Sequence, residues 1–371
     1  MTKNEILNLV QKVKILKKER ANTLPENSFF LDGEEILCYP RERGDSRYPY
    51  DNDGLVLFAH SDGYMDCVEG DFNVFKAAHY NEDTNIAFFA GEKTNSVFSP
   101  ISVTGAARQL FENDDINRYT VYTPACAYYV VETPKAIFAA RAYIDSKKHL
   151  RFSVCAVNLA EQREIYLSSF FEPTLRNTPF ETFFAIMAKF SKITKNGYVI
   201  ENKLSGRNFL AVRRSITGNV KKLYQTTAKN DFVCNRGGNL TNALSLKTGT
   251  ITNCREKANT TEIPVICDLC RFELKKDDFA ELNYDFLLTK DETAALDFAE
   301  SDADSALEEQ ELDTLHDAKR KAISDLNIEF ENLQSEKIHS ELLNNFLNCV
   351  KRQVNLCALN KNYAEIGRAH V

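Results

Sequence analysis

Residues 39 to 54 read YPRERGDSRYPYDNDG and gather side chains that are suited to recognising a sugar. Arginine guanidinium groups and carboxylates form paired hydrogen bonds with neighbouring hydroxyl groups, and tyrosine rings stack on the apolar face of a sugar ring. Pro40 and Pro49 exclude a helix, and Gly44 and Gly54 favour turns, so an irregular crossing loop is predicted here. The candidate binding residues are Arg41, Arg43, Asp45, Arg47, Tyr48, Tyr50 and Asp51.

A structural interpretation of the same stretch stays open. In this interpretation the arginines pair with neighbouring acidic residues and hold two strands together. Charged surface loops far outnumber binding sites, so the side-chain chemistry alone favours the structural role. The pairs would form between Arg41, Arg43 and Arg47 on one side and Glu42, Asp45 and Asp51 on the other.

Composition and charge exclude several classes of function. The 371 residues carry a formal net charge of -7, with an isoelectric point near 5.6, so no broad basic surface for nucleic acid is expected. The lysine-rich N-terminal stretch lacks the apolar block of a signal peptide, and no run approaches the roughly 20 apolar residues of a membrane span. We therefore predict a cytoplasmic protein whose ten cysteines are free thiols.

The remaining motifs give no catalytic, metal or cofactor site. Cys267 and Cys270 form a CxxC pair, but no second pair accompanies them, and on a strand the two thiols point to opposite faces. The sequence contains no phosphate-binding glycine-rich loop, no GxSxG and no HExxH motif. The histidines at positions 60, 79, 149, 316 and 339 are isolated, which is typical of surface or structural residues.

Most of the chain has the pattern of an antiparallel β-protein. Residues 3 to 20 first place Ile6, Val10 and Val13 at helical spacing, which predicts one amphipathic helix. From position 28 to about 288, short runs rich in aromatic and β-branched residues alternate with turn clusters, without long helices between them. This pattern predicts a mainly β fold, a large antiparallel β-sandwich. Residues 180 to 190 fit a helix or a strand equally well.

The composition changes near the C-terminal end. Residues 291 to 313 are acidic and lack lysine and arginine, which is typical of a solvated helix face or a linker. Apolar residues then recur at every fourth position from Ile338 to Val354, which predicts a helix whose apolar stripe needs another helix to cover it. The last seven residues resemble a translated sequencing adapter, so we expect the natural reading frame to continue beyond Ala364.

Four stretches resemble the N-terminal region of the β-1,2-oligoglucan phosphorylases of glycoside hydrolase family 94. They occur in the order expected for that family and span most of the chain. These stretches are LDGEEILCYPRE with GDSRYPYD (residues 31 to 51), PISVTGAARQ (100 to 109), RYTVYTPA (118 to 125), and residues 346 to 364 with VKRQV and KNYA.

The resemblance implies a β-sandwich, a helical linker and the first helix of an (α/α)6 barrel. It implies an inverting phosphorylase that cleaves β-1,2-linked glucooligosaccharides with inorganic phosphate as co-substrate, releases α-glucose 1-phosphate and forms a homodimer. The acid that protonates the leaving oxygen and the phosphate-binding residues would lie in the barrel, so this chain would hold no catalytic residue and be inactive alone. The expected division is a helix (1–22), the sandwich (23–290), an acidic helical linker (291–334), the start of the barrel (335–364) and the adapter-derived tail (365–371).

Two alternatives remain. The chain could be a non-catalytic carbohydrate-binding sandwich, although the uncovered stripe from Ile338 to Val354 argues against a complete module. It could also be the phosphorylase-like domain of a cyclic β-1,2-glucan synthase, which the start codon and the N-terminal helix disfavour. In the phosphorylases the sandwich packs near the active site and takes part in the dimer, so we expect the stretch from 39 to 54 to border a sugar cleft or a subunit contact.

Overall fold

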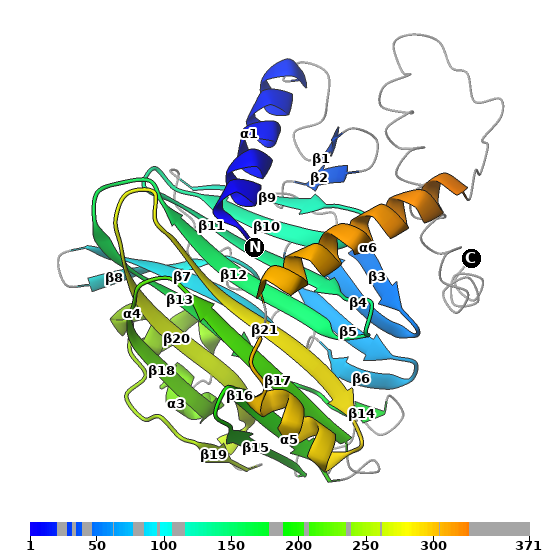
Figure 1. Ribbon diagram of the computed structural model, residues 1–371. Coiled ribbons are helices and arrows are strands. Elements are labelled where there is room, and N and C mark those ends of the chain that lie inside the picture. Colours follow the sequence, from blue (N-terminus) through cyan, green and yellow to red (C-terminus); the bar gives the residue numbers. More distant parts are fainter. Residues whose placement is uncertain are drawn as a thin grey trace.

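The computed structural model shows a mainly β protein built from antiparallel sheets that form a sandwich, with helices on its surface (Figure 1). This confirms the fold class expected from the sequence. The structure describes residues 1–20, 28–31, 35–38, 47–61, 63–76, 85–94, 97–105, 116–177, 188–203, 208–234, 239–259, 262–303 and 305–325.

The large sheet has eleven strands within the described residues, and all its neighbouring pairs are antiparallel. It crosses the molecule from the N-terminal strands to the strands around position 200. In spatial order its strands are β1 (Ser28–Leu31), β2 (Glu35–Cys38), β9 (Asn117–Tyr122), β10 (Cys126–Glu132), β11 (Ala136–Ile144), β12 (Leu150–Asn158), β21 (Phe279–Thr289), β17 (Asn208–Thr217), β16 (Gly197–Asn202), β15 (Lys189–Ile193) and β19 (Lys257–Ala258).

Two five-stranded antiparallel sheets accompany the large sheet. The second sheet consists, in spatial order, of β18 (Val220–Ala228), β20 (Pro264–Leu274), β13 (Arg163–Phe171), β7 (Ile86–Thr94) and β8 (Val97–Ser102). The third sheet consists of β14 (Arg176–Asn177), β6 (Phe72–Phe75), β5 (Met65–Glu69), β4 (Leu55–His60) and β3 (Arg47–Asn52).

One hydrophobic core joins the inner faces of the three sheets, and strand β11 shows how the sequence builds it. Alternate residues of a strand point to opposite faces. Phe138, Ala140 and Ile144 therefore face this core, whereas Ile137 and Tyr143 face the opposite, outer side of the large sheet. Aromatic rings fill the centre, where Phe171 and Phe286 meet edge to face with ring centroids 4.9 Å apart.

Helices cover the outer face of the large sheet, and for this reason its strands are apolar on both sides. Helix α1 (Lys3–Arg20) packs Ile6, Val10 and Val13 against β9 to β12, as the helical spacing predicts, and α6 (Ser305–Asp325) adds Leu312 to the same cluster. Helix α5 (Glu292–Glu300) covers β16 and β17 (Figure 1). The short helices α3 (Lys229–Val233), η3 (Leu240–Asn242) and α4 (Leu244–Thr248) cover the second sheet.

Some expectations differ from the structure or lie outside the residues that it describes. Residues Arg47–Asn52 form strand β3 rather than an irregular loop, because Pro49 sits on an edge strand, where a missing N–H is tolerated. Phe190 belongs to β15, which supports a strand at that end of the ambiguous segment, but residues 178–187 are outside the described part. The helix expected after position 335 and the tail from 365 to 371 are outside it too.

Candidate functional site

The predicted sugar-binding stretch contributes two buried tyrosines to the interior. The ring of Tyr48 stacks on that of Tyr122 with centroids 5.2 Å apart, and Tyr50 donates a hydrogen bond of 3.2 Å to the backbone oxygen of Thr123. Both rings are almost fully buried, so they join the third sheet to the large sheet and offer no exposed stacking surface.

Of the other predicted sugar-binding residues, the structure describes the side chain of Asp51 alone. The backbone oxygen of Asp51 accepts a hydrogen bond of 3.1 Å from Lys319 of α6, so strand β3 also supports this helix. Arg41, Arg43 and Asp45 lie outside the described residues, as does the side chain of Arg47. Sugar binding by this stretch therefore stays a prediction.

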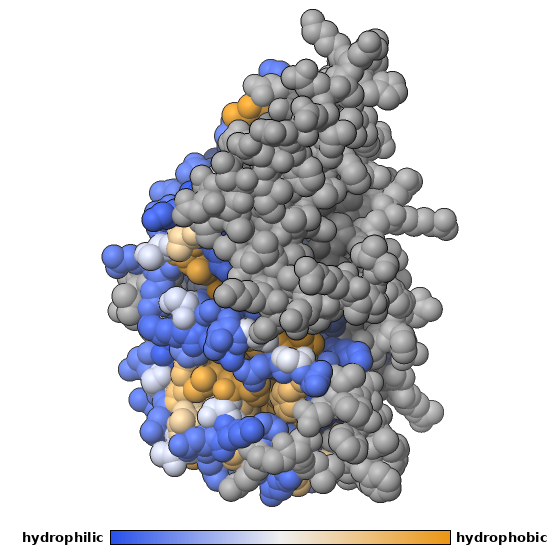
Figure 2. Space-filling model, turned by 90° about the vertical axis from the view of Figure 1, so that its right-hand side faces the viewer, coloured by the Kyte–Doolittle hydropathy of each residue, from blue (hydrophilic) through white to orange (hydrophobic). Residues whose placement is uncertain are grey.

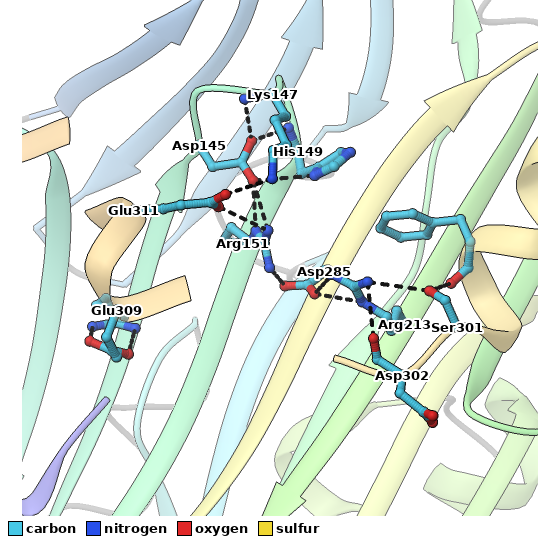
Figure 3. A network of polar contacts seen from close by, with 12 residues as sticks. Asp145, Lys147, His149, Arg151, Arg213, Asp285, Ser301, Asp302, Glu309 and Glu311 are labelled. Atoms are coloured by element: carbon cyan, nitrogen blue, oxygen red, sulfur yellow. Dashed lines mark hydrogen bonds and ion pairs between the residues drawn. The ribbon is translucent and has the colours of Figure 1, made fainter. Parts of the chain in front are cut away.

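A network of charged residues runs across the outer face of the large sheet (Figure 3). We call it the outer-face network. Its side chains come from three neighbouring strands of the sheet, from β11, from the turn between β11 and β12, and from helix α6. The members form two groups, one of Arg141 and Glu309 and the other of Asp145, Arg151, Arg213, Asp285 and Glu311.

Strand register places the central members side by side. Arg151 on β12 and Arg213 on β17 are both opposite Asp285 on β21, so the three side chains project from one face. Arg213 binds Asp285 at 2.7 Å and 3.0 Å and also donates to the hydroxyl group of Ser301, while Arg151 binds the other oxygen of Asp285. This row ties the strands to the segment that joins α5 to α6.

Asp145 extends the row at the turn after β11. Arg151 donates to it at 2.8 Å and 3.0 Å, and the ring of His149 lies 3.2 Å from the same carboxylate. Burial acts to raise the pKa of Asp145, but the contacts with His149 and the charge of Arg151 outweigh it and lower the pKa to about 2. Asp145 is therefore a carboxylate at neutral pH and not a proton donor.

Arg141 holds two helices at once. Its guanidinium group binds Glu309 of α6 through two hydrogen bonds of 2.6 Å and 3.0 Å, and it binds Glu5 of α1 at 3.1 Å. Burial acts to raise the pKa of Glu309, but the hydrogen bonds and charge of Arg141 lower it to about 2. Part of the acidic stretch from 291 to 313 is thus ion-paired with the sheet, where the sequence suggested a solvated face.

A second polar cluster lies between the large sheet and the second sheet, and we call it the inter-sheet cluster. It consists of Asp268, Arg214, Tyr198, Tyr284 and Ser169. Asp268 is completely buried and accepts hydrogen bonds from Tyr198 at 2.7 Å, Arg214 at 2.8 Å and Tyr284 at 2.9 Å. Burial, followed by the charge of Asp268, raises the pKa of both tyrosines well above the ordinary value, so they stay neutral donors.

The CxxC pair behaves as the strand pattern predicts. Cys267 packs under the short helices of the second sheet, and Cys270 faces the main core, so the two thiols point to opposite faces of β20. Burial raises the pKa of Cys270 to about 12 and that of Cys267 well above the usual range. Within the described residues no group of three or more histidine, cysteine, aspartate or glutamate side chains is arranged to hold a metal ion.

Sequence reasoning missed the outer-face network. Arg141, Arg151, Arg213 and Asp285 stand inside apolar strand runs such as AIFAARAYI, and a charge enclosed by such a run is a usable signal for a buried ion pair. Pairing them requires the strand order, because β12, β21 and β17 are distant in the sequence. Figure 2 shows apolar side chains gathered mainly in the lower part of the face it presents, with hydrophilic residues among them.

Comparisons with known proteins find distant structural similarity alone. A bacterial glucoamylase complexed with acarbose matches over 75% of this chain and 39% of its own length, with 11% identity and a TM-score of 0.42. A protein described as a candidate kojibiose phosphorylase from the human microbiome matches over 90% of this chain and 42% of its own, with 8% identity and a TM-score of 0.36. Heparinase III matches over 68% of this chain and 38% of its own length, with 12% identity and a TM-score of 0.29.

These similarities are too distant to establish a shared activity. This chain spans less than half of the length of each of the three structures. No protein-family profile matches the sequence, and no curated protein matches it. No helix of the described residues is long and apolar enough to cross a membrane.

Proposed function

We propose that the chain is the N-terminal part of an inverting glycoside phosphorylase. The whole enzyme would cleave β-1,2-linked glucooligosaccharides with inorganic phosphate and release α-glucose 1-phosphate. The proposal is supported by the four stretches that resemble β-1,2-oligoglucan phosphorylases, by their order in the chain, and by the mainly β architecture. We propose a cytoplasmic location and a homodimer on the same basis.

The observation that carries the proposal is the docking of α5 and α6 on the outer face of the large sheet. A sandwich followed by a helical linker is what the resemblance implies for this part of the chain. Arginine forks from the sheet hold this segment through Glu309 and through Ser301. A helical domain that follows α6 would then start from a fixed position relative to the sandwich.

Asp145, Glu281 and Glu309 suit a supporting role better than catalysis. Inverting phosphorolysis needs an acid that donates a proton to the glycosidic oxygen, which requires a raised pKa. The pKa of Asp145 and that of Glu309 are instead lowered to about 2. Burial raises the pKa of Glu281, but this side chain lies covered next to the ammonium group of Met1. We therefore propose that the catalytic acid lies in the barrel.

The stretch from 39 to 54 would support the sugar site in two ways, through its buried tyrosines and through its polar side chains. Tyr48 and Tyr50 anchor strand β3 in the interior, and we propose that the polar side chains of the stretch border the sugar cleft or the subunit contact. A non-catalytic binding module is less well supported, because the described rings of this stretch are buried and give a sugar no platform.

The test compares this chain with the protein encoded by the extended reading frame. Each is incubated with β-1,2-oligoglucans and phosphate, and separately with α-glucose 1-phosphate and sophorose, while glucose 1-phosphate and phosphate are measured. We expect no turnover by the 371-residue chain and turnover in both directions by the extended protein. Turnover by the chain alone would contradict the placement of the acid, and an inactive extended protein that still binds glucan would favour the binding module.

A further inference from the structure

Among the side chains of α6 that the structure describes, two leucines and several polar groups contact the large sheet. Leu312 is buried and Leu315 is half-buried beneath the helix. Because charged groups face the sheet beside these leucines, the docking of α6 responds to the charge state of the groups at this interface. The described polar contacts include Glu309 with Arg141 and, at 2.8 Å, with the N-terminal ammonium group of Met1. Glu311 lies 2.6 Å from Lys147 and 3.9 Å from Arg151, and Lys319 donates to the backbone oxygen of Asp51 at 3.1 Å.

His316 lies at the centre of this interface, with its ring turned toward the sheet. Its Nε2 atom is 3.7 Å from the Sγ atom of Cys126 on β10. Its Nδ1 atom is buried and has no hydrogen-bond partner among the described residues. A neutral imidazole has one N–H group, whereas the protonated ring has two and a positive charge. A second N–H and a charge would therefore be buried here without an acceptor, which is costly.

The charges around His316 oppose its protonation further. Burial, followed by the positive charges of Arg320 and Arg141, lowers the pKa of His316 from 6.5 to about 4. The negative charges of Glu5 and Asp317 act in the opposite direction but are outweighed. Glu5 is itself engaged by Arg141 and by the hydroxyl group of Tyr128. The facing groups are Asp317 and Arg320 from α6, Glu5 from α1, Arg141 from β11, and Cys126 and Tyr128 from β10.

We propose that α6 is a strap released by acid. At neutral pH it lies against the outer face of the large sheet, and protonation of His316 detaches it while the sandwich stays folded. The segment that leads out of the sandwich would thus be released more readily in mild acid than at neutral pH. This inference depends on the interface of α6 alone and holds whether or not the chain belongs to a phosphorylase.

The direction of the pH effect follows from proton linkage. The pKa of His316 is lower in the docked helix than in the released one, so the docked state binds fewer protons. The contribution of neutral His316 to docking is therefore fully present above pH 6.5 and is lost as the pH falls from 6.5 to 4. For one group with these two pKa values, the equilibrium constant for release is about 20-fold larger at pH 5 than at pH 7. Glu309, with its pKa of about 2, stays ionised throughout this range.

The thiol of Cys126 reports the release, because His316 of α6 lies directly against it. The 371-residue chain is treated with 4,4′-dithiodipyridine, which reacts with thiols in mild acid, and the rate of modification at Cys126 is measured by peptide mass spectrometry. The exposed Cys234 corrects for the pH dependence of the reagent, and the core residues Cys67 and Cys270 report global unfolding. We expect the corrected rate at Cys126 to rise about 20-fold from pH 7 to pH 5, because the rate follows the open population.

Two variants separate His316 from other titrating groups. In His316→Gln the amide stays neutral, and the rate at Cys126 should not change between pH 7 and pH 5. In the control His60→Gln, which alters a histidine of the third sheet, the rise should persist. A rise that persists in His316→Gln, or a flat profile in the unaltered chain, would overturn the proposal, and so would equal rises at Cys67 and Cys270.

A measurement on the unaltered chain covers the case in which His316→Gln itself loosens the helix. The ring proton of His316 is followed by NMR between pH 8 and pH 4. We expect it to titrate clearly below 6.5, and the reactivity of Cys126 to rise between pH 6.5 and the pH of that titration. A titration of His316 at its ordinary pKa would show that the ring is already exposed at neutral pH, which would contradict the docked strap.

Discussion

The inter-sheet cluster and the outer-face network use the same residue types for different purposes. Each places arginine against aspartate within apolar surroundings. In the inter-sheet cluster, Asp268 is completely buried between two sheets, and each of its oxygens accepts a hydrogen bond from within the fold. In the outer-face network, the partner on the helix side is Glu309 of α6, whose side chain is 28% exposed.

The difference shows that the surroundings of an ion pair decide what it stabilises. A pair between two sheets stabilises the whole fold, whereas a pair between a sheet and a helix stabilises the attachment of that helix. Removing Asp268 leaves Arg214, whose side chain is 9% exposed, without its partner between two sheets, and these sheets separate only on unfolding. Removing a partner at the helix–sheet interface leaves a charge that becomes hydrated when the helix moves away. The inter-sheet cluster should therefore control global stability, and the outer-face network should control the attachment of α6.

The largest expected effect comes from Asp268→Asn. Arg214 loses its negative partner, and the amide group brings a donor to a site where two tyrosines already donate. The free energy of unfolding should fall by about 3 to 5 kcal/mol, measured by urea denaturation. Asp277→Asn, on an exposed turn, is the matched control and should change it by less than about 0.5 kcal/mol.

An intermediate effect is expected from Arg141→Met. The change leaves Glu5 and Glu309 without their common partner, but both carboxylates are partly exposed and remain hydrated when α6 leaves. The docking equilibrium should weaken by about 2 kcal/mol, which is about 30-fold faster modification of Cys126 at pH 7. Cys67 and Cys270 should stay protected.

The control for that variant is Arg255→Met, which removes an arginine that binds Asp231 beside the second sheet. It should leave the reactivity of Cys126 unchanged. If Arg141→Met lowered the urea midpoint as much as Asp268→Asn without exposing Cys126 first, the proposed distinction between the two regions would be wrong.

The smallest effect is expected from Lys147→Met at the rim of the outer-face network. The ammonium group of Lys147 lies 2.6 Å from Glu311, but the lysine side chain is 57% exposed. Exposed ion pairs contribute little because water solvates both charges. The rate of modification at Cys126 should change by less than about threefold. A change as large as that of Arg141→Met would show that the number of charges, rather than their burial, holds α6.

The sequence by itself determined the mainly β class, the N-terminal helix with Ile6, Val10 and Val13 on its buried side, and the opposite orientations of Cys267 and Cys270. These features depend on the periods of 3.6 and 2 residues, which are local properties of the backbone. The tertiary structure alone decided that Tyr48 and Tyr50 face the core, and that Arg151 and Arg213 share Asp285. Those contacts join strands far apart in the chain, and local periodicity does not specify which strands become neighbours.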